Sequence, residues 1–108
     1  MEKRVTVTLL SDFYGALLTP HTREVLRLYL EEDMSLQEIA SELGVSRQAV
    51  HDAVARGEKQ LAEYEEKLGL LERFRRMQER LTACREALET AAEALETAKA
   101  ALKDIEEP

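Results

Sequence analysis

The sequence of 108 residues is poor in the residues that make turns, covalent crosslinks and membrane spans. It contains two prolines, four glycines, no tryptophan and a single cysteine, Cys84. So few turn residues disfavour a many-stranded β fold. A lone cysteine excludes an internal disulfide and cannot by itself form a four-ligand zinc site. Because no segment approaches the roughly 20 apolar residues of a transmembrane helix, and the N-terminus lacks a signal-peptide core, we expect a cytoplasmic protein without metal or membrane insertion.

Positive charge is also scarce. The chain carries 22 acidic and 15 basic residues, a formal net charge of −7, and its pI is about 4.9. This balance disfavours wholesale electrostatic capture of nucleic acid, so any basic contact must be local. Hydrophobic residues make up 44% of the chain and charged residues 34%, a mixture typical of packed helices rather than of a disordered chain. The length allows one domain and an appendage.

The N-terminal third predicts two amphipathic helices. The first is expected over residues 9–18, where apolar side chains recur at steps of three and four and would form a buried face. They are Leu10, Phe13, Tyr14, Leu17 and Leu18. The alternating segment 5–8 has no partner strand, so it is expected to be a frayed or helical start. Thr19 and Pro20 then fit the cap and first position of a second helix, which runs to about Glu32.

The next segment has the pattern of a helix-turn-helix. Ser35 and Glu38 have the spacing of a capping box, Gly44 fits a left-handed helix end, and Ser46 can cap a further helix. The two helices are expected over residues 36–43 and 47–68. Because the turn between them has only about three residues, their axes must cross steeply.

A heptad repeat fills the C-terminal third. Apolar residues alternate at steps of four and three from Leu70 to Ile105, which predicts a coiled-coil helix roughly 50 Å long. The seam residues expected to face a partner helix are Phe74, Met77, Leu81, Leu88, Leu95 and Leu102. Cys84 lies on the same seam, and we interpret it as a small buried hydrophobe. The chain thus divides into a helix-turn-helix domain, residues 1–69, and a coiled-coil helix, residues 70–108, and a homodimer is expected.

Two arrangements of this long helix remain open. Its first half could fold back at Gly69 onto the preceding helix, with Tyr64 opposite Phe74 and Gly57 opposite Leu81, so that large and small side chains interdigitate. Alternatively, the helix could continue through Gly69 as one bent rod, which would make the whole seam intermolecular.

Two motifs carry a resemblance to a known family. Residues 29–61 resemble the DNA-reading fourth region of sigma factors, and F-Y-x-x-L-L-T at residues 13–19 with G-V-S-R-Q-A-V at residues 44–50 is similar to the YlxM family over about residues 9–80. That family consists of small bacterial helix-turn-helix proteins encoded beside components of the signal recognition particle. The resemblance implies an all-α, sigma-region-four-like fold of four to five helices, a dimer, and a role in the signal recognition particle pathway. The alanine-rich repeat after Ala83 departs from the family pattern.

The second helix of the helix-turn-helix carries the first set of candidate nucleic-acid contacts. Its first turn holds Arg47 and Gln48, residue types that pair with guanine and adenine edges. The other candidates on this helix are His51, Arg56 and Lys59. Asp52 points outward among them and repels phosphate, and even four phosphate contacts would give a salt slope of only about −4. A helix that keeps this fold but binds a protein is an equally good interpretation.

A second candidate set lies near the start of the coiled coil. Five arginines fall within residues 73–85, and Arg75, Arg76 and Arg80 are candidate phosphate contacts for RNA or DNA, because the arginine fork matches phosphate oxygens. The ordinary interpretation is a solvated flank with pairs such as Glu72 and Arg76.

No residue pattern indicates catalysis. The two histidines, His21 and His51, fall on different predicted helices, no nucleophile has an activating partner, and there is no glycine-rich phosphate loop. We expect a noncatalytic protein without a cofactor that acts in the signal recognition particle pathway through contacts with its protein or RNA. The alternatives are a sequence-specific transcriptional regulator that binds DNA as a dimer, and an adaptor whose coiled coil is the working surface.

Overall fold

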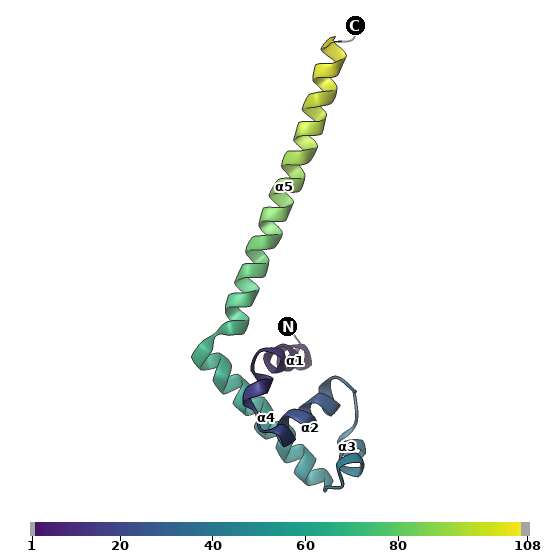
Figure 1. Ribbon diagram of the computed structural model, residues 1–108, viewed down its shortest axis with the longest axis vertical. Helices are drawn as coiled ribbons and strands as arrows, with labels where there is room; N and C mark the ends of the chain where they lie inside the picture. The colour runs from purple at the N-terminus through teal and green to yellow at the C-terminus, as the bar shows by residue number, and fades with distance from the viewer. Residues whose placement is uncertain (1, 107–108) are drawn as a thin grey trace. The chain divides into compact units, whose positions relative to one another are not determined.

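The computed structural model describes residues 2–106, which form five α-helices and one 3-10 turn without a strand among them (Figure 1). The elements are α1 (Lys3–Tyr14), η1 (Gly15–Leu17), α2 (Pro20–Leu30), α3 (Leu36–Leu43), α4 (Arg47–Leu68) and α5 (Leu70–Glu106). The expected all-α helix-turn-helix fold with a long C-terminal helix is confirmed. The chain divides into two compact units, Met1–Leu71 and Glu72–Pro108. The outermost residues of the two expected domains, Met1, Glu107 and Pro108, lie outside the described residues.

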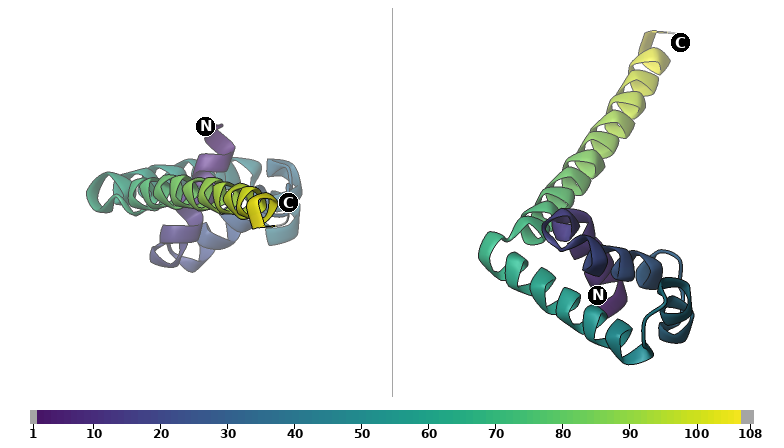
Figure 2. Two further views of the ribbon diagram at one scale, coloured as in Figure 1. Left: turned by 90° about the horizontal axis from the view of Figure 1, so that it is seen from above. Right: turned by 60° about the horizontal axis from the view of Figure 1, so that its bottom comes forward.

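Within the first unit, α4 is the helix on which the others pack. α1, α2 and α3 all contact it, and α2 also contacts α3 (Figure 1 and Figure 2). The fully buried residues of the resulting core include Tyr14, Val25, Leu26, Ile39, Val50 and Leu61. Gly57 allows α2 and α4 to approach closely, since a Cβ at this position would lie 2.7 Å from Leu26 Cδ1. Burial of this apolar surface is what stabilises the unit.

The first helix differs from its predicted range. α1 begins at Lys3 instead of residue 9, because Val7 and Leu10 already belong to the buried face; the helical start expected for residues 5–8 is confirmed. α1 ends at Tyr14, where the chain tightens into η1. Phe13 and Leu17, which were expected to be buried, are therefore 36% and 56% exposed, while Leu18 after the tight turn faces the core.

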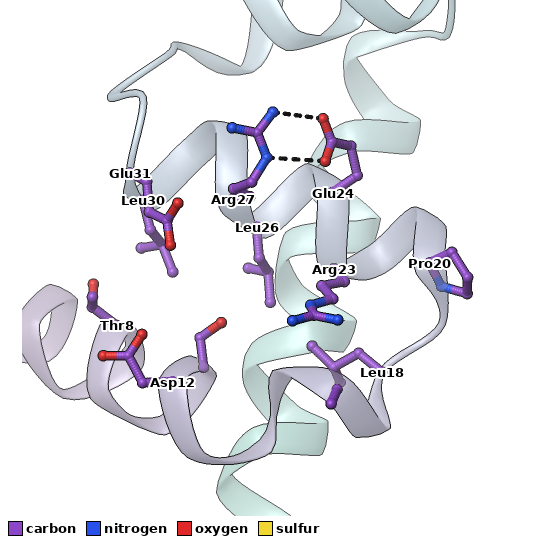
Figure 3. A pocket seen from close by; sticks show the side chains of 12 residues that line it. Thr8, Asp12, Leu18, Pro20, Arg23, Glu24, Leu26, Arg27, Leu30 and Glu31 are labelled. Atoms are coloured by element: carbon purple, nitrogen blue, oxygen red, sulfur yellow. Dashed lines mark hydrogen bonds and ion pairs between the residues drawn. The ribbon is translucent and has the colours of Figure 1, made fainter.

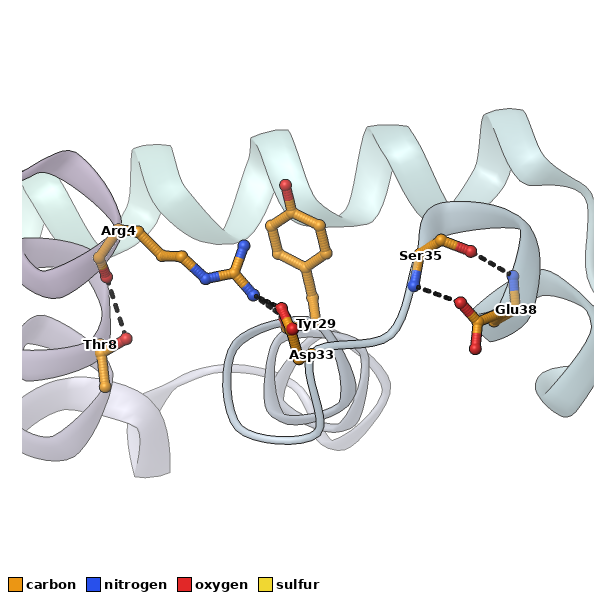
Figure 4. A network of polar contacts seen from close by, with 6 residues as sticks. All are labelled: Arg4, Thr8, Tyr29, Asp33, Ser35 and Glu38. Carbon is orange, nitrogen blue, oxygen red and sulfur yellow. Dashed lines mark hydrogen bonds and ion pairs between the residues drawn. The ribbon is translucent and has the colours of Figure 1, made fainter.

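The caps of the helix-turn-helix form as predicted. Ser35 Oγ accepts a hydrogen bond from the Glu38 N–H at 3.1 Å, and the Glu38 carboxylate accepts from the Ser35 N–H at 3.2 Å (Figure 4). Gly44 is left-handed at φ 69°, and Ser46 Oγ accepts from the Ala49 N–H at 3.0 Å. Both helices of the motif therefore begin and end at their predicted residues.

A contact from α1 holds the connection between α2 and α3. Arg4 donates hydrogen bonds to the Tyr29 carbonyl and, at 3.0 Å, to the Asp33 carboxylate, and its guanidinium lies 4.9 Å from the centre of the Tyr29 ring (Figure 4). Asp33 is left-handed at φ 52°, a backbone conformation that is uncommon outside glycine. α2 ends at Leu30, slightly before the predicted Glu32.

The junction between α4 and α5 is a break in the helix. Gly69 is left-handed at φ 63° and its N–H donates to the Glu65 carbonyl at 2.8 Å, so the alternative of one helix continuing through Gly69 is wrong. The fold-back of α5 on α4 stays a prediction. The close approach at Gly57, which was assigned to Leu81, is however taken by Leu26 and Thr22 of α2.

Candidate nucleic-acid interface

The second helix of the motif, α4, separates a buried and an exposed face. Val50, Val54 and Leu61 point into the core, and the opposite face carries the candidate contacts. Arg47, Gln48, His51, Arg56 and Lys59 are all exposed. The side chains predicted to read base edges are therefore placed where a ligand can reach them.

Asp52 occupies the middle of this face and engages two of the candidates. Its Oδ1 accepts a hydrogen bond from Gln48 Nε2 at 2.9 Å and lies 3.5 Å from His51 Nδ1. The Gln48 amide must leave Asp52 before it can pair with an adenine edge. The carboxylate also repels any phosphate that approaches His51.

Three basic residues on the exposed face of α4 form no ion pair within the described part of the chain. Among the described residues, Arg47, Arg56 and Lys59 have no salt-bridge partner within 4.0 Å, whereas the neighbouring Glu58 pairs with Lys3 at 3.6 Å. They remain available for a ligand, but acidic side chains outnumber them. Residues 31–60, from the end of α2 to the middle of α4, hold seven carboxylates against three cations, a net charge of −4. Three of these carboxylates, Glu32, Asp33 and Glu58, are paired with Arg27, Arg4 and Lys3 from other parts of the first unit. The four that remain still outnumber the three cations, so the surface offers a polyanion no net positive charge.

The arginines of α5 form one row rather than a single cluster. α5 is an uninterrupted helix from Leu70 to Glu106, and at 3.6 residues per turn Arg73, Arg76 and Arg80 share a face. Arg75 lies on another side of the helix and does not join this row. The predicted pair of Arg76 with Glu72 is present, with Nε 3.2 Å from the carboxylate. The row is the most basic surface of the second unit.

A groove of about 700 Å³ opens between α1 and α2 (Figure 3). Arg27 lies at its wall and donates to both oxygens of Glu24, at 3.0 and 2.8 Å, and to Glu32 at 3.2 Å. These bonds lower the pKa of the Glu24 carboxyl and raise that of the Arg27 guanidinium. Asp12 and Glu31 also line the groove. The lining thus holds two arginines, Arg23 and Arg27, against three carboxylates, so its charge does not favour an anionic ligand.

The seam residues of α5 are exposed. Met77, Leu88 and Ile105 have exposed fractions of 61%, 66% and 78%, and Phe74, Leu81, Leu95 and Leu102 are also exposed. Cys84, expected to be buried, is exposed as well, because its burial needs a partner helix. Among residues 2–106, no group of three or more potential metal ligands occurs and no helix is both long and apolar enough to span a membrane.

The structure also shows a polar site that sequence reasoning missed. The buried Tyr14 hydroxyl donates to the Glu65 carboxylate at 2.6 Å and accepts from the Leu70 N–H at 3.0 Å, and Glu65 accepts from the Leu71 N–H at 3.0 Å. These bonds cap the first backbone donors of α5. The separation of 51 positions between Tyr14 and Glu65 hides the pairing, although both residues belong to segments that resemble the YlxM family.

Comparison with known proteins identifies related chains. Residues 1–105 match the family UPF0122, described as "Putative helix-turn-helix protein, YlxM / p13 like". A UPF0122 protein of Desulforamulus reducens is 52% identical over 68 residues, which cover 63% of this chain and 58% of that protein. Those of Geobacillus kaustophilus and Clostridium botulinum are 51% and 49% identical, over 70% and 68% of this chain and 69% and 67% of their own lengths.

Proposed function

Because the chain belongs to the YlxM / p13-like helix-turn-helix family, we propose that it is a noncatalytic protein of the signal recognition particle pathway that contacts the particle's RNA or protein rather than duplex DNA. The observation that carries this proposal is the charge of the helix-turn-helix surface. Over residues 31–60, four carboxylates without a lysine or arginine partner accompany three cations without an acidic partner, whereas specific duplex binding depends on neutralising several phosphates.

The internal contacts of α4 support the same conclusion. Gln48, which could read adenine, already donates to Asp52, and that carboxylate accepts usefully from DNA only where a cytosine amine is in reach. A surface of this kind fits a protein partner with complementary positive charge.

The arginine row of α5 supports an RNA contact. Arg73, Arg76 and Arg80 follow one face of a continuous helix, and residues 72–85 hold five arginines against two glutamates, a net charge of +3. Arginine forks bind the phosphates and unpaired regions of RNA without needing a base-reading helix.

The test compares three ligands with the full chain: the particle's RNA, its protein subunit, and duplex DNA. We expect the RNA or the protein subunit to bind at least tenfold more tightly than duplex DNA at about 150 mM salt, where weak phosphate contacts are largely lost. If RNA is the ligand, Arg76→Gln with Arg80→Gln weakens binding and flattens its salt dependence. The control, Lys99→Gln with Lys103→Gln, makes the same charge change on the acidic half of α5 and leaves binding unchanged.

Tight, sequence-selective binding of duplex DNA would contradict this proposal. It would be recognised by its loss in the variant Arg47→Ala with Gln48→Ala, which removes the two side chains of the first turn of α4 that can reach base edges.

A further inference from the structure

The second unit presents an apolar seam along an otherwise polar helix. Leu81, Leu88, Leu95 and Leu102 recur every seven residues and are at least half exposed. Between them, the other seam positions hold the small residues Cys84, Ala91 and Ala98. A continuous helix with this pattern buries its seam against another helix.

The charges of α5 are divided between its two halves. Residues 72–85 hold five arginines and two glutamates, a net charge of +3, and residues 86–106 hold six carboxylates and two lysines, a net charge of −4. A helix with this polarity is complementary to a copy of itself that runs in the opposite direction. Two copies running in the same direction would place like charge beside like charge.

We propose that α5 pairs with α5 of a second copy of this chain as an antiparallel coiled coil, with Leu95 opposite the partner's Cys84. The seam from Phe74 to Ile105 then overlaps completely. Within it, Leu81 lies opposite the partner's Ala98, and Leu88 lies opposite the partner's Ala91. This inference does not depend on the proposed function.

The sizes of the seam residues favour this orientation. In an antiparallel pair each of the central layers contains one leucine and one small residue, so the distance between the helix axes is uniform and the layers are filled. In a parallel pair, leucine layers would alternate with layers of two alanines, and the leucines would hold the helices too far apart for the alanines to touch.

The positions beside the seam add a second argument. A parallel pair would place Arg80 of each chain next to Arg85 of the other, since these positions flank the seam on opposite sides five residues apart and meet across a parallel interface. The antiparallel pair avoids this repulsion. Half of the other flanking positions hold the small residues Ala87, Ala92, Ala94 and Ala101, which let two helices approach closely.

The single cysteine reports the orientation in the unmodified chain. In the proposed pair the two Cys84 thiols lie about 17 Å apart along the coil, eleven residues at 1.5 Å each. Mild oxidation is therefore expected to give no covalent dimer, while light scattering shows a dimer of the full chain. A parallel pair would place both thiols at one level, within reach of a disulfide.

A second thiol tests the register. Leu95→Cys is expected to form disulfides between position 95 and the partner's Cys84, detected as a covalent dimer and located by peptide mapping. The control Leu95→Cys with Cys84→Ser has only one thiol per chain, and these thiols again lie about 17 Å apart, so it should not crosslink.

Charge placed on the seam tests the surface itself. Leu88→Lys with Leu95→Lys is expected to give a monomer, whereas Thr97→Lys with Ala100→Lys adds the same charge away from the seam and should leave the dimer intact. A monomeric unmodified chain, a disulfide between two Cys84 residues, or the absence of a crosslink in Leu95→Cys would each overturn the proposal.

Discussion

Glu24 and Arg27 form a two-bond pair on the exposed side of α2. The hydrogen bonds from Arg27 hold the pKa of Glu24 below its usual value of 4.5. We expect Arg27→Gln to return that pKa to the usual value, as followed by an NMR titration of the Glu24 carboxyl. The control is Arg23→Gln, one helical turn before Arg27, which should leave the pKa of Glu24 lowered.

The direction of this pKa shift determines how the contribution of the pair to stability depends on pH. The pKa of Glu24 is lower in the folded than in the unfolded chain, so the pair stabilises the fold above about pH 4.5, and this contribution is lost as the pH falls through the folded value. Because the pair is exposed, its effect on stability is small. An unshifted Glu24 pKa in the unmodified protein would mean that the pair does not persist in solution.

Gly57 is the point where α2 and α4 come closest. A Cβ there would lie 2.7 Å from Leu26 Cδ1 and 3.0 Å from Thr22 Cγ2, and both residues are buried. Gly57→Ala gains about 1 kcal/mol of helix propensity but overpacks the core by about 1–3 kcal/mol. We expect a net loss of about 1 kcal/mol in the free energy of unfolding, measured with urea.

The double variant Gly57→Ala with Leu26→Ala separates overpacking from other effects. The smaller side chain at position 26 makes room for the new methyl group. The double variant should therefore lose less free energy of unfolding than the sum of the losses in the two single variants. If the Gly57→Ala protein were as stable as the original, α2 would be able to move away from α4 without a loss of stability.

The turn of the helix-turn-helix depends on Gly44. Its backbone is left-handed and nothing lies within 4 Å of the position of a Cβ, so a side chain here meets backbone strain without a clash. Gly44→Ala should lower the free energy of unfolding by about 1 kcal/mol. Gly44→Asn should lower it less, because asparagine tolerates this conformation. Equal losses in the two denaturation curves would contradict this reading of the turn.

The start of α5 depends on the Tyr14 hydroxyl. Tyr14→Phe removes the donor to Glu65 and the acceptor for the Leu70 N–H, and should cost about 1–3 kcal/mol of unfolding free energy in this buried position. Tyr64→Phe is the control, because the Tyr64 hydroxyl makes only a 3.5 Å contact in an exposed place. Similar losses from the two substitutions, measured by urea denaturation, would show that the cap is unimportant.

Elements with local signals were predictable from the sequence. α3 and α4 have their predicted bounds because Ser35, Gly44 and Ser46 act on backbone groups within three or four residues. The end of α1 was missed, since the change to η1 after Tyr14 depends on packing against the core.

The bond from Gln48 to Asp52 follows from their spacing of four residues on one helix. The contacts of Arg4 with Tyr29 and Asp33 span 25 and 29 residues, so no local pattern indicates them.

At the scale of the whole molecule, the two units obtain their stability in different ways. The buried cluster runs from Val7 to Leu71, and no residue of α5 beyond Leu71 belongs to it among those described. The first unit should therefore unfold at a temperature independent of protein concentration. The pairing proposed for α5 buries the seam of its distal part through association, so the melting of this part should shift upward with protein concentration.

Removal of residues 86–108 tests this division. The shortened chain keeps every core residue, so the free energy of unfolding of the first unit should change by less than about 0.5 kcal/mol. The concentration-dependent transition should disappear from the circular dichroism melt, because every layer of the proposed pair loses at least one of its two residues. If the transition of the first unit also weakened and became concentration-dependent, the two units would be stabilising each other, and the seam of α5 would have a partner within the first unit.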